Sequence, residues 1–216
     1  MRRLTSLPSP GALNRLSHLQ QRRQAAANGG NPLTKAEARG YADDVVKESL
    51  IAETSSKCAY CESFVFHVAW GDVEHILAKA AACHPELAFD YGNLTIACSR
   101  CNNAKGDYCD PSLPLVNPYV DDPEEHFVWV GSMTLPRNGS PRGELTRYRL
   151  KLDRKGLAER RQERIEQVMV LAQRYLNEPS GPRKEALFEQ LQLEVDKDRE
   201  YTAHVAAAIR MMGVPM

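Results

Sequence analysis

Cys58-Ala59-Tyr60-Cys61 and Cys98-Ser99-Arg100-Cys101 are two Cys-x2-Cys knuckles, and 36 residues separate them. Each knuckle turns its sulfurs towards one point, so the pair suits a tetrahedral Zn²⁺ with zinc–sulfur distances of about 2.3 Å. Because four thiolates leave no open coordination position, we expect a structural zinc bound by the four knuckle cysteines. Such a metal supplies much of the folding free energy of a segment with little core. The alternative is two redox or incidental cysteine pairs.

The composition of the 216-residue chain is that of an ordinary globular protein, with 43% hydrophobic and 26% charged residues. Uncharged runs such as residues 168–173 are far shorter than the roughly 20 apolar residues that cross a bilayer, so we expect no membrane span. Residues 4–20 are interrupted by prolines and polar residues, which argues against a secretory signal. We therefore expect a cytoplasmic protein in a reducing environment, where clustered cysteines favour metal. Cys83 and Cys109 lie outside the knuckles and are expected to be free thiols.

Charge is unevenly distributed along the chain, although the formal net charge is zero. Residues 137–164 hold ten basic and four acidic residues, whereas residues 58–119 hold three basic and seven acidic ones. A basic flank beside an acidic centre suits a metal site that must also hold phosphate. The alternative is that the basic stretch is a solvated helix face. The zero net charge argues against a broad electrostatic binder of nucleic acid.

Breakers and periodicity divide the chain into four segments. Residues 1–57 are an N-terminal extension, loosely ordered to residue 34 and then helical to about residue 53 from a capping box at Thr34. Residues 58–110 form the zinc-stapled core, with a hairpin in 58–70, a short strand at 72–76 and a helix near Asn102. Residues 111–150 are a Pro-rich connector with a strand at 126–130. Residues 151–216 contribute helices for partner docking or packing, the first capped by Asp153.

Between the knuckles lie residues suited to phosphodiester hydrolysis. The reaction needs an activated water, a cation for the developing charge and help for the leaving oxygen. A neutral imidazole takes a proton near pH 7, which His75 offers. Mg²⁺ or Mn²⁺ prefers oxygen ligands and keeps several waters, so the carboxylate of Glu74 and the amide oxygen of Asn102 are sufficient protein ligands.

These residues, in this order, resemble the HNH endonucleases, and the resemblance assigns each one a role. His75 stands at the position of the general base, and Glu74 at the preceding metal-ligand position. Asn93 matches the middle Asn that fixes the loop and orients the His, and Asn102 matches the last position, usually His. Lys105 matches a recurrent basic residue that binds substrate. The implied fold class is α+β, mainly α-helical with a small zinc-stapled ββα-metal core.

A narrower resemblance is to the HNH proteins of Septu-type and retron-associated antiphage systems. It rests on Val73-Glu74-His75, on Cys101-Asn102 with Lys105-Gly106-Asp107, and on Leu150-x-Leu152-Asp153. Ala78-Lys79 departs from the usual Pro-Lys after the His. The resemblance implies a nuclease effector that cleaves nucleic acid, DNA in preference to RNA, beside an ATPase partner. The alternative is a zinc-stapled nucleic-acid or protein binding module without catalysis, which would not need Glu74, His75 and Asn102.

Overall fold

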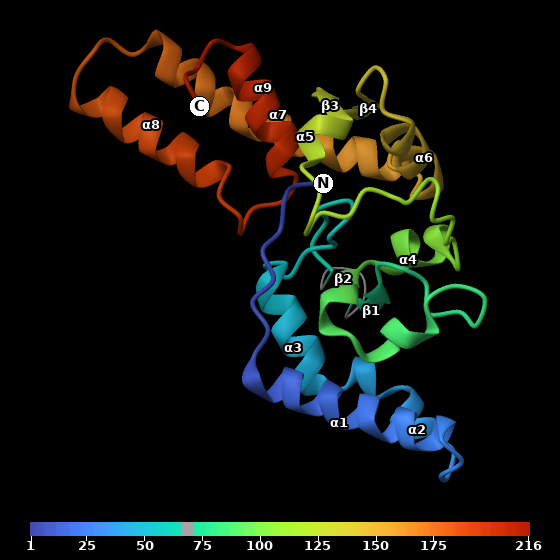
Figure 1. Ribbon diagram of the computed structural model, residues 1–216. Helices are drawn as coiled ribbons and strands as arrows, with labels where there is room; N and C mark the ends of the chain where they lie inside the picture. Colours follow the sequence, from blue (N-terminus) through green and yellow to red (C-terminus); the bar gives the residue numbers. More distant parts are fainter. Residues whose placement is uncertain (66–70) are drawn as a thin grey trace.

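The computed structural model describes residues 1–65 and 71–216 and shows a central two-stranded core with helices on both sides (Figure 1). Strand β1 (Asp72–His75) pairs antiparallel with β2 (Leu94–Ala97), in a register that sets Asp72 opposite Ala97 and His75 opposite Leu94. Helix α4 (Ser99–Lys105) follows β2 directly. This is the arrangement of two strands and a helix that the resemblance implies, and it confirms the α+β fold class.

The N-terminal segment is more helical than expected. Helix α1 (Pro10–Ala27) begins at Ser9, whose hydroxyl accepts a hydrogen bond from Ala12 N, and has Pro10 in its first turn. The expectation of loose order up to residue 34 is therefore wrong over α1. Pro at the first helical position has no N–H to lose and a φ already suited to a helix, so Ser9-Pro10 starts a helix rather than breaking one.

The helix expected over residues 34–53 is divided into three pieces: α2 (Lys35–Ala38), the 3-10 turn η1 (Gly40–Ala42) and α3 (Asp44–Glu53). The capping box at Thr34 is confirmed, because its hydroxyl and the Glu37 carboxylate exchange bonds with backbone N–H groups. The chain turns at Gly40, where a Cβ would lie 2.6 Å from Leu19 Cδ1 of α1. A larger residue at position 40 would require the Leu19 side chain to shift, so glycine lets η1 pack closely on α1.

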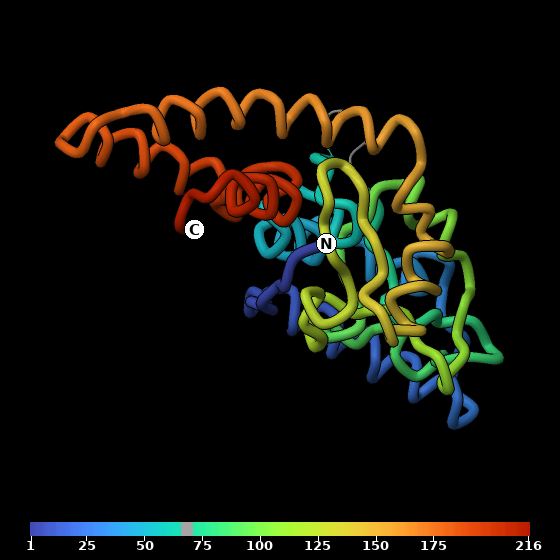
Figure 2. Tube along the Cα trace, turned by 90° about the horizontal axis from the view of Figure 1, so that it is seen from above, coloured from blue at the N-terminus to red at the C-terminus, as the bar shows by residue number. Residues whose placement is uncertain are grey.

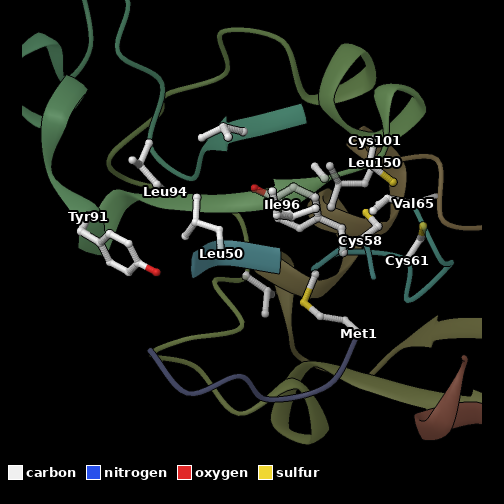
Figure 3. Close-up of a cluster of buried hydrophobic side chains, with 14 of the residues drawn as sticks. Met1, Leu50, Cys58, Cys61, Val65, Tyr91, Leu94, Ile96, Cys101 and Leu150 are labelled. Carbon is white, nitrogen blue, oxygen red and sulfur yellow. The ribbon is translucent and has the colours of Figure 1, made fainter. Parts of the chain in front are cut away.

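The main hydrophobic cluster lies between α3, β2 and the first knuckle (Figure 3). Leu50 from α3 and Ile96 from β2 are fully buried in it, together with the side chains of Cys58 and Cys61. Between β1 and β2 the chain forms two short 3-10 turns, η2 (Pro85–Phe89) and η3 (Tyr91–Asn93). Of the hairpin expected in residues 58–70, a bridge between Lys57 and Phe64 is seen, and Phe66 and Val68 lie outside the described residues.

After the core, helix α5 (Pro123–His126) leads into a second antiparallel pair, β3 (Phe127–Val130) with β4 (Met133–Pro136), and then α6 (Pro141–Arg149). The strand expected at 126–130 is confirmed by β3. Asp153 does not cap the next helix, as was expected. Arg154 holds the N-cap position, and the Asp153 carboxylate instead pairs with Arg147 Nε at 2.7 Å.

The C-terminal helices form a second cluster of buried residues. Helix α7 (Lys155–Asn177) extends away from the body, α8 (Pro182–Glu194) returns along it, and α9 (Thr202–Met211) packs against both α7 and β3 (Figure 2). Leu157, in the first turns of α7, belongs to the main cluster, whereas Ile165 and Val168 belong to the second. None of the described helices combines the length and the apolar character of a membrane span.

Candidate functional site

The four knuckle cysteines converge as a metal site requires. Their sulfur atoms all lie within 4.8 Å of one another, and Cys61 Sγ is 3.8 Å from Cys98 Sγ. Tetrahedral zinc with bonds of about 2.3 Å places its sulfurs about 3.8 Å apart. The donor set and its spacing therefore fit a Zn²⁺ closed to water. Figure 3 shows three of these cysteines, Cys58, Cys61 and Cys101, gathered at one side of the buried cluster.

Backbone bonds attach the first knuckle to the core. Ala59 N donates to Ile96 O of β2 at 2.9 Å, and Glu62 N donates to Cys58 O at 2.9 Å. The second knuckle is formed by the start of α4, with Cys98 in the N-cap position and Cys101 in the first turn. A metal held by both knuckles consequently fixes α4 against the end of β2.

An arginine contacts the cysteine cluster from outside the core. Arg154 Nη1 lies 3.6 Å from Cys101 Sγ, and its Nη2 lies 3.9 Å from Cys98 Sγ. The same guanidinium donates to the carbonyl oxygens of Leu150 and Lys151. Sequence reasoning missed this residue, because 53 positions separate it from Cys101 and nothing in its own segment marks it.

One face of β1 carries acidic groups that meet α4. Glu74 Oε1 lies 2.7 Å from Lys105 Nζ in a pair whose side chains are 7% and 2% exposed. Two residues earlier, Asp72 Oδ2 accepts a hydrogen bond from Asn102 Nδ2 at 3.1 Å. Residues i and i+2 of a strand share a face, so Asp72 and Glu74 both point towards α4. Asp72 was not among the expected site residues, and its two-residue spacing from Glu74 is the signal that marks it.

The buried position of Glu74 and its charged neighbours shift its pKa. Burial raises the pKa of Glu74, the charge and hydrogen bond of Lys105 oppose the rise, and the neighbouring carboxylate of Asp72 adds to it. A carboxylate in such a place is stabilised by positive charge. Lys105 provides that charge in this structure, against the carboxylate that was expected to bind the divalent cation. Lys105 was expected to contact the substrate, but its side chain is buried in this structure.

His75, the last residue of β1, has partners different from those of Glu74. Its Nε2 lies 3.0 Å from the carbonyl oxygen of Ala88. Because a carbonyl only accepts, Nε2 carries the hydrogen and Nδ1 keeps the lone pair. Burial lowers the pKa of His75 to about 4, although the Ala88 bond opposes the shift. The imidazole is thus neutral at pH 7, as a proton acceptor must be.

Asn93 fastens the loop that follows His75. Its Oδ1 accepts from Leu77 N at 2.8 Å, and its Nδ2 donates to Leu77 O at 2.9 Å. The side chain is 4% exposed, so water does not compete for these bonds. A two-way clamp of this kind holds the chain just beyond β1 in one conformation, consistent with the loop-fixing role expected of Asn93.

The structure brings the expected site residues together in part. Glu74 and Lys105 are in contact, and Asn102 lies beside them on α4, bonded to Asp72. The His75 imidazole contacts Ala88 and Tyr41 and, among the described residues, forms no hydrogen bond with Glu74 or Asn102.

Most charges of the basic stretch at residues 137–164 are engaged within the protein. Arg142 pairs with Asp121, Arg164 pairs with Glu194, and Arg161 is fully buried with Nη1 on the carbonyl of Leu152. Exposed pairs along one helix face also occur, between Arg160 and Glu163 and between Lys155 and Glu159. The basic stretch is therefore largely paired with groups of the chain itself.

Cys83 and Cys109 form a disulfide, so the expectation that they are free thiols is wrong. Their Cα atoms are 5.8 Å apart across a sequence separation of 26. The loop after β1 folds back against the segment after α4, and that approach cannot be read from cysteine spacing. The disulfide joins the loop that follows β1 to the segment that follows α4.

Comparison with known proteins gives matches that include the residues of the candidate site. Residues 58–108 match the family model described as HNH endonuclease. A Septu protein PtuB of Bacillus thuringiensis is 35% identical over 83 residues, which cover 38% of this chain and 32% of the relative. A Septu protein PtuB of Bacillus mycoides (strain KBAB4) is 29% identical over 157 residues, covering 59% of this chain and 53% of the relative. The chain thus matches about a third and about half of the lengths of these two relatives.

Proposed function

We propose that this chain, an HNH-family protein of the Septu-associated kind with its HNH endonuclease domain at residues 58–108, is a metal-dependent endonuclease that hydrolyses phosphodiester bonds. The observation that carries the proposal is the state of His75. A buried, neutral imidazole is held through Nε2 by the Ala88 carbonyl, one position after a carboxylate that faces α4. A zinc-stapled binding module has no need of that arrangement.

His75 is the general base in this proposal. Its Nδ1 takes a proton from a water as the water oxygen forms a bond to phosphorus, the bond from phosphorus to the leaving sugar oxygen breaks, and that oxygen takes up a proton from solvent. Ala88 stabilises the imidazolium that forms, because its carbonyl accepts the Nε2 hydrogen in both protonation states. Asn93 keeps the loop beyond His75 in place, so the ring meets the substrate in one orientation.

Glu74 and Asn102 are the proposed protein ligands of a divalent cation, Mg²⁺ or Mn²⁺. When bound, such a cation stabilises the charge that develops on the phosphate oxygens. Asp72 has a positioning role, because its carboxylate takes the Asn102 Nδ2 hydrogen and leaves Oδ1 as the atom for a cation. Lys105 holds the Glu74 carboxylate in the absence of the cation.

The wider biological role follows from the resemblance to Septu proteins. We assign the chain to a cytoplasmic antiphage defence system, in which it cleaves nucleic acid, DNA in preference to RNA, together with an ATPase partner. The C-terminal helices are the proposed docking element. Helix α7 exposes Val170 and α8 exposes Leu193, each 58% accessible, on the part of the chain that extends from the body.

The central test compares wild type with His75→Ala. Both proteins, co-purified with the ATPase partner, are incubated with Mg²⁺ or Mn²⁺ and plasmid DNA or total RNA. We expect wild type to break down nucleic acid and His75→Ala to lose at least a hundredfold in rate, on the order of the contribution of general base catalysis. Equal breakdown by both proteins would remove His75 as the base and favour the binding module.

A second comparison tests the structural role of the zinc site separately from the catalytic role of His75. His75→Ala is expected to keep its zinc and a cooperative melt, because the imidazole lies outside the cysteine cluster. Cys58→Ser is expected to lose both, since three thiolates bind zinc less tightly and the knuckles anchor α4. Metal analysis and thermal melts measure the two. A Cys58→Ser protein that melts like wild type would refute the staple.

A further inference from the structure

Lys79, Tyr41 and His75 stack in series. Lys79 Nζ lies 3.4 Å from the centroid of the Tyr41 ring. The same ring meets the His75 imidazole edge-on, with centroids 4.5 Å apart and an interplanar angle of 68°. Tyr41 thus has a cation on its face and the proposed base at its edge, and it covers a histidine that is 6% exposed.

Three separate parts of the fold build this stack. Tyr41 comes from η1, His75 ends β1, and Lys79 lies in the loop after β1. Asn93 clamps that loop through Leu77, two positions before Lys79. The placement of Lys79 is therefore fixed by the same side chain that fixes the loop beyond His75.

The charge of Lys79 remains available to a ligand. Across residues 1–65 and 71–216, no carboxylate forms an ion pair with Lys79, and its side chain is half-buried rather than enclosed. Lys105, the other lysine of the core, is buried against Glu74. Burial lowers the pKa of His75, and the positive charge of Lys79 lowers it further.

We propose that Lys79 is the residue that binds a phosphate oxygen of the substrate beside His75, and that Tyr41 is a positioning residue that presents the ammonium there. The inference rests on the nuclease function proposed above. An ammonium is a compact charge with three donors on a flexible stem. At a partly exposed site, the contact of the ammonium with the Tyr41 ring is weaker than a charge-assisted hydrogen bond to phosphate. A phosphate oxygen can therefore replace the ring as the partner of the Lys79 ammonium.

The test measures binding without cleavage. Fluorescence anisotropy with a labelled DNA duplex, in Ca²⁺ to prevent turnover, gives Kd at several salt concentrations for the full chain. Lys79→Met is expected to raise Kd several-fold and to reduce the slope of log Kd against log salt by about 0.9, the loss of one phosphate contact. Lys79→Arg is expected to restore the slope. Lys155→Met, which removes a lysine with a 91% exposed side chain from α7, is the matched control and is expected to change neither quantity.

Tyr41 is tested by conservative rescue. Tyr41→Phe keeps the aromatic face and is expected to bind as wild type, whereas Tyr41→Leu is expected to weaken binding as Lys79→Met does. A wild-type slope in Lys79→Met, or an equal loss in Lys155→Met, overturns the proposal, and so does a wild-type protein that binds no duplex. The nuclease assignment fails separately, if His75→Ala cleaves as fast as wild type.

Discussion

Arg154 Nη1 donates to Cys101 Sγ at 3.6 Å, so a residue from the start of the C-terminal helices bonds to the metal-binding cluster of the core. Four thiolates around Zn²⁺ carry two net negative charges, and the guanidinium offsets part of that charge at the surface of the cluster. It is held in place by the carbonyls of Leu150 and Lys151. Such outer partners orient metal ligands and change the affinity for metal.

Replacing Arg154 by Met is expected to weaken zinc binding by about 10- to 100-fold, the usual effect of losing an outer partner of a ligand. Zinc release to a coloured chelator measures it, independently of nuclease activity. Arg160→Met is the control, because Arg160 pairs with exposed Glu163 on α7. Equal release rates for the two variants would contradict a role for Arg154 at the thiolates.

Glu74 and Lys105 form a buried pair. We therefore expect the protein to lose stability when Lys105 is removed, and a divalent cation to restore part of that stability. Lys105→Met leaves an uncompensated buried carboxylate, and we expect the free energy of unfolding of the zinc-loaded protein, without added Mn²⁺, to fall by about 3–5 kcal/mol. Adding Mn²⁺ is expected to recover more stability in Lys105→Met than in wild type, since the cation replaces the missing charge. Urea unfolding with and without Mn²⁺ measures both.

The double variant Glu74→Gln with Lys105→Met is the control for this pair. It removes both charges and is expected to be closer to wild type without added Mn²⁺, but to gain no extra stability from Mn²⁺. If Mn²⁺ stabilises Lys105→Met no more than wild type, Glu74 is not a ligand of the cation.

The Cys83–Cys109 disulfide closes a loop with a sequence separation of 26. Cross-linking a loop of that size removes chain entropy worth about 3–4 kcal/mol from the unfolded state. Cys83→Ser is therefore expected to unfold at lower urea than oxidised wild type and to match wild type that has been reduced. Alkylation mass spectrometry under non-reducing conditions checks that the bridge is present. A Cys83→Ser protein as stable as oxidised wild type would contradict its contribution.

His204 predicts a loss of stability in mild acid. The residue is 1% exposed, and burial together with the charge of Arg161 lowers its pKa well below the ordinary value. The unfolded chain takes up a proton below a pH of about 6.5, whereas the folded protein keeps His204 neutral. Folding stability should therefore fall as pH decreases from about 6.5 towards the lowered folded pKa.

His204→Gln is expected to flatten this pH dependence, because glutamine does not titrate and retains a donor for Thr134, which bonds His204 Nε2 at 3.1 Å. Urea unfolding between pH 5 and pH 7 tests it. Parallel pH profiles for the variant and wild type would show that His204 does not titrate in this range.

Local patterns in the sequence predict the core well. Two residues between paired cysteines place both sulfurs on one side of a turn, so the zinc site is encoded within each knuckle. The strand that carries His75 and the helix that carries Asn102 follow from short runs next to the knuckles. Helix α1 was missed because its start signal, Ser9-Pro10, was interpreted as a break.

Contacts between distant segments could not be predicted. Arg154 reaches Cys101 and Cys83 reaches Cys109 only after the connector and the loops have folded. The same holds for Tyr41, which contacts His75 and Lys79. Tyr41 lies in the turn between Gly40 and Asp43, in a segment that was expected to be one helix. No spacing rule relates such residues, since tertiary packing alone determines their distance.

The length of α7 has a mechanical consequence. A 23-residue helix spans about 35 Å, and only its first turns are embedded beside the zinc staple, where Arg154 precedes it. Its outer part is braced by α8 and α9 in a separate cluster. A displacement of the far end of α7 is therefore expected to reach Arg154, whose guanidinium contacts Cys98 and Cys101.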